Sequence, residues 1–276
     1  MAKGLNSRGN FGEQIKGIRD AGFTAVETFH SGWRKLEDSQ VRELQAALKE
    51  HDVLFYNLHI WDNIIHPDPA RRQKCHDEYL RIIECAEQVG IKFVLVHTGS
   101  RGNGTPGVPH PENWTEETWK MSVDALRKVI DETSGSKVNL AVEAINTNNS
   151  NNPAAHVRLK SDVGDRLKYT LDPTNMMFAG NVFRSTELIN ECFELMGEDI
   201  MYAHAKDVQW ADMLPGLKWV IPGQGVMDYE VYLTHLSRMK TSRVLMVEFL
   251  QGDNQYAQAR EYIEQTAEKL GVKIYK

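Results

Sequence analysis

Acidic residues and a histidine stand where apolar runs of the sequence end. Glu143, Asp172 and Glu248 each follow apolar residues directly, and His204 lies within the run 201–205. Burying a carboxylate costs free energy unless the group is paired, hydrogen-bonded or bound to a cation. Three carboxylates and one imidazole would form an oxygen-rich site with open positions, which suits Mn²⁺, Mg²⁺ or Co²⁺ better than a thiolate-seeking metal. The sequence therefore predicts a site for one divalent metal ion.

Each of these acids also has a structural interpretation. It could cap the N-terminus of the helix that follows or pair with a lysine at the surface. This interpretation explains any single residue as well as metal binding does. All four residues take the same position at the end of an apolar run, however, and the shared position favours one common site.

Strand-like runs alternate with segments of helical periodicity along the whole chain. The predicted strands are Lys3–Asn6, Thr24–Phe29, Val53–Ile60, Phe93–His97, Val138–Ile145, Leu167–Asp172, Met201–Ala205 and Val244–Phe249. The predicted helices are Phe11–Ala21, Gln40–Glu50, Ala70–Val89, Thr115–Glu132, Pro153–Val163, Ser185–Met196, Tyr229–Met239 and Gln255–Leu270. Val208–Pro222 is predicted to be a loop.

Eight strand–helix units predict an α/β fold, a single (β/α)₈ TIM barrel that occupies residues 1–276 as one domain. Nearly all-apolar strands are typical of parallel sheets that are buried on both faces. In such a barrel the strand C-termini open onto one face, which carries the chemistry. The alternative is a doubly wound nucleotide-binding fold, because Gly102–Gly107 fits the GxGxxG pattern. Pro106, Pro109 and Pro111 stand where its phosphate-binding helix should begin, which argues against that alternative.

The composition excludes several classes of protein. The chain has 276 residues, 41% of them hydrophobic and 25% charged, with a formal net charge of −6. We expect no membrane-spanning segment, because no apolar stretch reaches about 18 residues. An acidic balance argues against a general nucleic-acid binder. We predict a cytoplasmic protein with reduced cysteines, because no signal peptide precedes the three thiols and none has CxxC spacing.

Several strings of the sequence resemble the xylose isomerase-like TIM barrels. They are AGFTAVE, VHTG, VEAIN, LDPTN, HAKDV, PGQGVMDY and VEFL, and the resemblance runs over nearly the whole chain. This superfamily contains sugar isomerases and epimerases, and the resemblance implies that Glu143, Asp172, His204 and Glu248 hold one divalent ion. Mn²⁺ is the preferred metal, with Mg²⁺, Co²⁺ or Zn²⁺ also suitable. The resemblance further implies a homo-oligomer.

The resemblance implies a mechanism in which a ketose or keto sugar passes through an enediolate. Glu143 and Glu248 would act as metal-bound acid and base on opposite sides of the sugar. Lys206 lies two residues after His204, so it faces the same side of its strand. It would hydrogen-bond a substrate oxygen or donate a proton, and an ion pair with a neighbouring acid is an equally good alternative.

Further residues near the strand ends are predicted to bind the sugar. Indole rings pack well against the C–H faces of sugars, and imidazoles and amides bind hydroxyl groups. Each residue also has a structural alternative in the core. The predicted substrate-binding residues are His59, His97, Trp33, Trp61, Asn175 and Trp210.

Other reactions of the superfamily stay open. A lyase or dehydratase would eliminate a leaving group from a keto sugar or inosose through the same enediolate. An abasic-site DNA endonuclease is disfavoured, because Asn175 replaces one histidine of its zinc set and Val208–Pro222 lacks its Asp-x-His pair. A carbohydrate-binding barrel without activity is the third alternative. The absence of an evident Arg/Lys cluster for phosphate, apart from Arg101, favours a free ketose or cyclic keto sugar.

Overall fold

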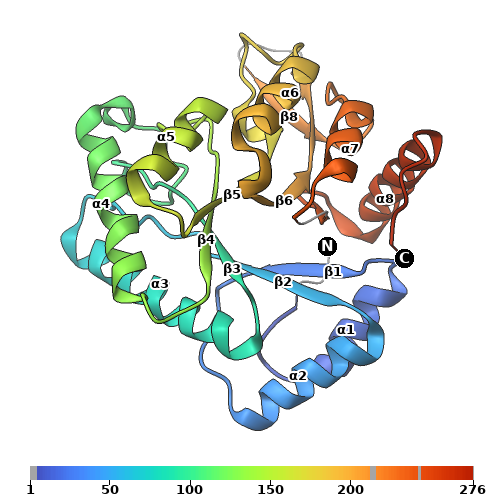
Figure 1. Ribbon diagram of the computed structural model, residues 1–276, viewed down its shortest axis with the longest axis horizontal. Helices are drawn as coiled ribbons and strands as arrows, with labels where there is room; N and C mark the ends of the chain where they lie inside the picture. Colours follow the sequence, from blue (N-terminus) through green and yellow to red (C-terminus); the bar gives the residue numbers. More distant parts are fainter. Residues whose placement is uncertain (1–4, 212–215, 242–243, 276) are drawn as a thin grey trace. The chain divides into compact units, whose positions relative to one another are not determined.

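Parallel strands alternate with helices in both halves of the chain. The computed structural model describes residues 5–211, 216–241 and 244–275. Two compact units, Gly4–Lys168 and Tyr169–Lys276, are called the N-terminal unit and the C-terminal unit. Each unit is described by itself (Figure 1).

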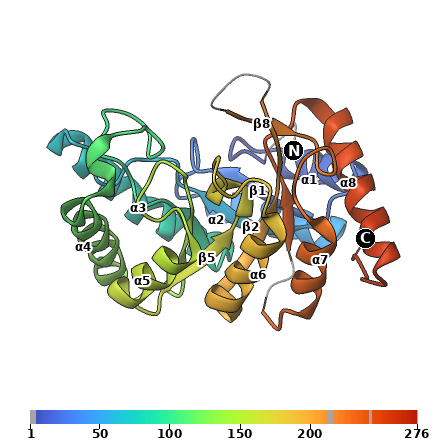
Figure 2. The ribbon, with the colours of Figure 1, turned by 90° about the horizontal axis from the view of Figure 1, so that it is seen from above.

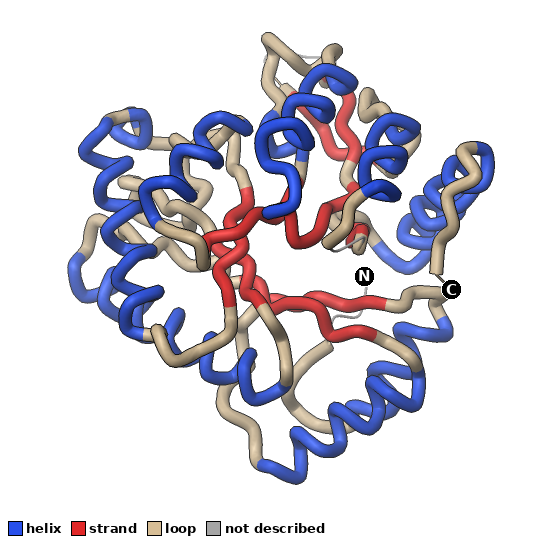
Figure 3. Tube along the Cα trace, viewed as in Figure 1, coloured by secondary structure: helices blue, strands red, loops and turns tan. Residues whose placement is uncertain are grey.

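The N-terminal unit contains a parallel sheet with the strand order β1-β2-β3-β4 (Figure 3). The strands are β1 (Ala25–Phe29), β2 (Leu54–His59), β3 (Phe93–Val96) and β4 (Asn139–Glu143). Phe29 lies opposite His59, and His59 lies opposite Leu95. Every residue of β3 is buried, as the all-apolar run predicted. The helices are α1 (Phe11–Asp20), α2 (Asp38–His51), α3 (Pro69–Val89), α4 (Glu116–Glu132) and α5 (Pro153–Val163), with the 3₁₀ turn η1 (Pro111–Trp114).

Local signals in the sequence set the ends of the longest helix. The side chain of Asp68 accepts hydrogen bonds from the backbone N–H groups of Ala70 and Arg71, and Pro69 occupies the first helical position of α3. Gly90 ends the helix with φ = 88°, a conformation that glycine adopts without steric cost. The helices of this unit cover its sheet, and α4 and α5 lie side by side (Figures 1 and 2).

The C-terminal unit continues the same alternation. In it residues 169–171 of β5 (Leu167–Leu171) pair in parallel with β6 (Ile200–Ala205), and β6 pairs in parallel with β9 (Leu245–Val247). The helices α6 and α7 are neighbours (Figure 1). The helices are α6 (Ser185–Met196), α7 (Tyr229–Arg238) and α8 (Gly252–Lys269), with the 3₁₀ turns η2 (Pro173–Met176) and η3 (Gly197–Asp199).

An antiparallel hairpin stands where the sequence predicted a loop. Strand β7 (Asp207–Trp210) pairs with β8 (Leu217–Val220), with Asp207 opposite Val220. The loop prediction for Val208–Pro222 was therefore wrong over these strands, and residues 212–215 lie outside the described part of the chain. Each strand has only four residues and mixes polar with apolar side chains, so neither shows a clear hydrophobic pattern that would predict a strand.

The predicted helices all have counterparts, and so do seven of the eight predicted strands. The exception is Lys3–Asn6. Its first two residues lie outside the described range, and Leu5 and Asn6 are not part of a strand. The backbone N–H of Asn6 donates instead to the side chain of Gln14. None of the described helices is long and apolar enough to cross a membrane.

Candidate functional site

Four polar side chains converge in the C-terminal unit, and we call them the lysine–carboxylate cluster: Asp172, His204, Lys206 and Glu248. The ammonium of Lys206 lies 2.6 Å from Asp172 Oδ2 and 2.5 Å from Glu248 Oε1. His204 Nδ1 lies 3.0 Å from Glu248 Oε1 and 3.8 Å from Asp172 Oδ2. Asp172 and His204 are fully buried, and Lys206 is 3% exposed. The ion pair that the sequence offered as one role for Lys206 is therefore present.

Local turns and two tyrosines fix the backbone of this cluster. Asp172 follows β5 and caps η2, where its Oδ1 accepts from the backbone N–H and the hydroxyl of Thr174. Its Oδ2 is thereby left to face Lys206. The hydroxyl of Tyr232 lies within hydrogen-bonding distance of the carbonyls of Leu171 and His204, and the hydroxyl of Tyr229 donates to the carbonyl of Lys206. Helix α7 thus holds the ends of β5 and β6 in place.

The charges in the cluster determine the protonation of its acids. Burial alone would raise the pKa of Asp172, but the nearby Lys206 ammonium and His204 outweigh it and hold this pKa well below its usual range. Burial also opposes ionisation of Glu248, and His204 and Lys206 together lower its pKa to about 2. Both acids are therefore carboxylates at neutral pH. Each presents a buried oxygen, Asp172 Oδ2 or Glu248 Oε1, to the Lys206 ammonium.

Aromatic and amide groups surround the ammonium of Lys206. Asn175 Oδ1 accepts a hydrogen bond from Lys206 Nζ at 3.3 Å. The ring centroid of Phe249 lies 4.3 Å from Nζ, and that of Trp219 lies 5.2 Å from it. Both distances are within the range of a cation–π interaction. A polar partner and an aromatic cover thus add to the two carboxylates around one buried cation.

Asp207, the residue after Lys206, organises the backbone around the hairpin. Its carboxylate accepts hydrogen bonds from the N–H groups of Val208, Gly223, Gly225 and Met227. Burial raises the pKa of Asp207, although these four hydrogen bonds oppose the shift. A Cβ at Gly225 would lie 2.1 Å from Asp207 Oδ1, so only glycine fits there. This contact explains the glycine-rich string before α7.

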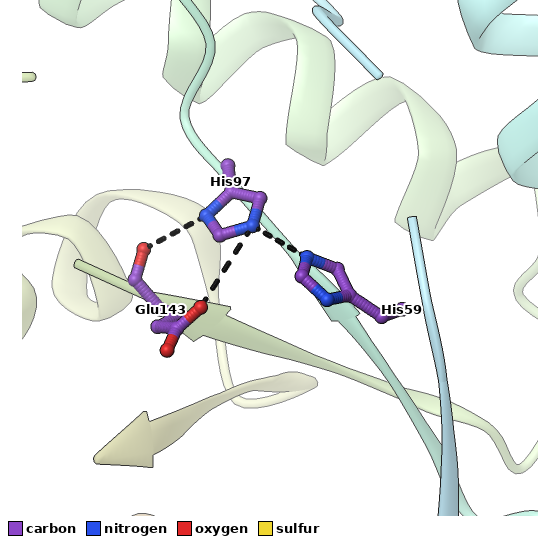
Figure 4. Close-up of side chains that lie close together, drawn as sticks. All are labelled: His59, His97 and Glu143. Atoms are coloured by element: carbon purple, nitrogen blue, oxygen red, sulfur yellow. Dashed lines mark hydrogen bonds and ion pairs between the residues drawn. The ribbon is translucent and has the colours of Figure 1, made fainter. Parts of the chain in front are cut away.

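A second group in the N-terminal unit consists of His59, His97 and Glu143, which we call the imidazole pair with its carboxylate (Figure 4). The Nε2 atoms of His59 and His97 lie 2.8 Å apart. His97 Nδ1 lies 3.3 Å from the backbone oxygen of Glu143, and its Nε2 lies 3.9 Å from Glu143 Oε2. Because a carbonyl only accepts, His97 carries a proton on Nδ1. Of the two facing Nε2 atoms, one donates and the other accepts in the hydrogen bond between the rings.

The remaining predicted substrate-binding residues take different environments. Trp61 packs edge-on against both His59 and His97, with ring centroids 5.6 Å and 4.8 Å away. Trp210 lies on β7, 6.4 Å from the ring of Phe183. Trp33 is buried against Phe11 and Phe55. The environment of Trp33 favours the structural alternative, in which the indole fills the core beside α1 and β2.

Sequence reasoning missed Phe249 and the two tyrosines Tyr229 and Tyr232. Aromatic residues at such positions are usually core residues, and no motif distinguishes them. The hydroxyls that reach Leu171 and His204 become evident only when α7 is placed beside the strand ends. The position of Phe249 directly after Glu248 was the one available signal.

The donor atoms of the lysine–carboxylate cluster fit a divalent cation. Two ionised carboxylates and one imidazole are a donor set that Mn²⁺, Mg²⁺ and Zn²⁺ accept. Asp172 Oδ2 and Glu248 Oε1 are buried and face the ammonium of Lys206, and buried carboxylate oxygens of this kind require such a cationic partner. His59, His97 and Glu143 are a second possible donor set, which is richer in nitrogen.

The xylose isomerase-like TIM barrel family matches residues 15–266, so the chain belongs to this family. The match confirms the predicted fold class, an α/β TIM barrel. A search of curated proteins found no match.

Solved structures show the same fold. A xylose isomerase-like TIM barrel protein from Mycobacterium smegmatis in complex with magnesium has a TM-score of 0.68 and 16% identity, covering 94% of this chain and 89% of that one. D-Psicose 3-epimerase from Clostridium cellulolyticum H10 with D-tagatose has a TM-score of 0.70, 15% identity and 96% coverage of both chains. 3-Keto-D-glucoside 4-epimerase from E. coli has a TM-score of 0.65 and 20% identity, covering 96% and 99%.

Proposed function

We propose that this protein is a divalent-metal-dependent isomerase or epimerase of a ketose or keto sugar. The observation that carries the proposal is the pair of ionised carboxylates, fully buried Asp172 and mostly buried Glu248, beside His204 at the ends of neighbouring strands. Family membership supports it. The titles of similar structures name epimerases of psicose and of a keto-glucoside, and one names bound magnesium.

Asp172, His204 and Glu248 would hold the metal, with Glu143 as the fourth ligand that the family resemblance predicts. Mn²⁺ is the metal we propose. A divalent ion in such a site acidifies the C–H bond beside a chelated carbonyl. Glu143 and Glu248 would remove a proton from that carbon and return one to the same or a neighbouring carbon, passing through an enediolate.

Lys206 would supply a hydrogen bond or a proton to a substrate oxygen. Its ammonium is already held among Asp172, Glu248 and Asn175, so it would meet the sugar with little loss of side-chain entropy. His59, His97, Trp61 and Trp210 would bind the rest of the small sugar, with Asn175 beside Lys206. The packing of Trp33 argues against a direct contact for that residue.

Solvent exchange tests this function most directly. The protein is incubated in D₂O with Mn²⁺ and a panel of keto sugars, including D-psicose, D-tagatose and a 3-keto-glucoside. We expect deuterium at the carbon beside the carbonyl and an isomeric product, detected by NMR and mass spectrometry. Loss of water from the product would instead indicate the dehydratase alternative.

Glu248→Gln is the decisive variant, because it removes the base and a proposed ligand while keeping the shape of the side chain. We expect exchange to fall by at least about 10³-fold. Glu191→Gln, an exposed carboxylate on α6, is the matched control and should exchange like the wild type. Full exchange by Glu248→Gln, or none by the wild type across the panel and several metals, would contradict the proposed function.

A further inference from the structure

Phe249 has a backbone conformation that bulky residues rarely adopt. Its φ is 59°, in the left-handed region. Among the described residues, two other non-glycine residues share a positive φ, Asn10 and Asp52. Asn and Asp tolerate this region through local hydrogen bonds, whereas a large aromatic residue gains nothing there. A bulky residue kept at such a position requires compensation from its surroundings.

The side chain of Phe249 provides the compensation by covering Lys206. Its ring centroid lies 4.3 Å from Nζ, and 5.5 Å from the ring of Trp219, which contacts the same ammonium from β8. Phe249 is 55% exposed and Trp219 is 48% exposed, whereas Lys206 is only 3% exposed. The two rings are therefore exposed to solvent themselves and shield the ammonium from it.

Excluding water strengthens the contacts of Lys206 with Asp172 and Glu248. Charge–charge attraction rises as the local dielectric constant falls. A lysine side chain is a flexible four-carbon chain, so an uncovered ammonium would sample several positions. A ring face above Nζ limits these positions and favours the cation through its quadrupole.

We propose that Phe249 is a positioning residue, whose left-handed backbone places an aromatic ring over the Lys206 ammonium. The ring holds this cation between Asp172 and Glu248 and excludes water from it. The inference rests on the proposed function for its effect on turnover. Its effect on the exposure of Lys206 is independent of any substrate.

Three variants of the full chain separate the ring from the backbone strain. Phe249→Tyr keeps the ring, while Phe249→Ala and Phe249→Gly both remove it. Labelling by an amine-reactive acetylating reagent, followed by mass spectrometry, reports how far Lys206 is exposed. We expect faster labelling of Lys206 in the Ala and Gly variants, with Lys16 as the exposed internal reference. The Tyr variant should label like the wild type.

The melting temperature and kcat of these variants should change independently of each other. The Gly variant should melt about 2–4 °C above the Ala variant, because glycine relieves the left-handed strain. Both should lose kcat by about 10-fold or more on the sugar that the wild type accepts, and the Tyr variant should restore it. A merely structural residue would instead lose activity in proportion to stability.

Asp52→Ala and Asp52→Gly are the matched controls. Asp52 ends α2 in the same left-handed region and lies in the N-terminal unit. These variants should reproduce the difference in melting temperature without changing Lys206 labelling or kcat. Wild-type labelling of Lys206 in Phe249→Ala and Phe249→Gly would overturn the inference. A wild-type protein inactive on every sugar would contradict the proposed function, while the labelling result would still decide this one.

Discussion

The two polar groups of the molecule balance their charges in different ways. In the N-terminal unit His59 and His97 share one hydrogen bond, and the second nitrogen of His97 uses a backbone carbonyl. In the C-terminal unit Asp172 and Glu248 are both ionised and are balanced by the buried ammonium of Lys206. The first group is held by hydrogen bonds of its imidazole rings, and the second by ion pairs around one ammonium.

The difference predicts how much stability each group loses when one of its side chains is replaced. A charge-balanced cluster loses most when its cation is removed, because two buried carboxylates then face each other. A hydrogen-bonded pair of imidazole rings loses about the value of one hydrogen bond. Loss of the cation should therefore destabilise the lysine–carboxylate cluster more than loss of a hydrogen bond destabilises the imidazole pair. Its two ionised acids could also bind a divalent cation.

Removing the charge of Lys206 should have the largest effect. Lys206→Met keeps most of the side-chain volume but leaves Asp172 and Glu248 unbalanced. We expect the free energy of unfolding to fall by about 3–5 kcal/mol. Urea denaturation monitored by circular dichroism measures the change. Excess Mn²⁺ should recover more stability in this variant than in the wild type, because a divalent ion would balance the same carboxylates.

Lys16→Met is the control for this variant. Lys16 pairs with Asp20 at the surface of α1, where both side chains are about 60% exposed. Such a pair contributes less than about 1 kcal/mol. Equal losses in the two lysine variants would remove the contrast between the clusters.

Much of the fold follows from periodicity, but the hairpin does not. The buried run Phe93–Val96 and the helix stop at Gly90 are local signals, and both were predicted within a residue. The hairpin of β7 and β8 depends on Asp207, whose carboxylate gathers backbone N–H groups as far along the chain as Met227. No local pattern encodes such a contact.

The candidate site was predictable where the alternation of side chains along a strand decides which way a side chain points. His204 lies in β6 and Lys206 follows the last residue of that strand, and both reach Glu248. A position near a strand end gives no information about packing, so it placed Trp33 near the chemistry, whereas its ring fills the core. It also cannot reveal a positive φ, and therefore the position of the Phe249 ring was not foreseen.

Acid should destabilise the protein through a histidine outside both clusters. His156 on α5 is fully buried, and burial lowers its pKa to about 4, well below the value of about 6.5 in an unfolded chain. The folded state thus prefers neutral His156. Its contribution is complete above pH 6.5 and is lost as the pH falls towards 4, amounting to about 3 kcal/mol. Urea midpoints between pH 4 and 7.5 measure the loss.

His156→Gln separates this titration from the acids of the C-terminal unit. The variant cannot gain a proton in this range, so its stability should change less between pH 6.5 and 4 than that of the wild type. The lowered pKa values of Asp172 and Glu248 place their own loss of stability below about pH 4. An unchanged pH dependence in His156→Gln would assign the acid sensitivity to other groups.

The imidazole pair should give the smallest effect. His97→Gln keeps a polar side chain of similar size but weakens the hydrogen bonds to His59 and to the carbonyl of Glu143. We expect a loss of about 1–2 kcal/mol in urea denaturation. The loss should be nearly independent of Mn²⁺ if this group is only a hydrogen-bonded pair. A loss as large as that of Lys206→Met would contradict the contrast between the two groups, because the loss of one hydrogen bond costs only about 1 kcal/mol.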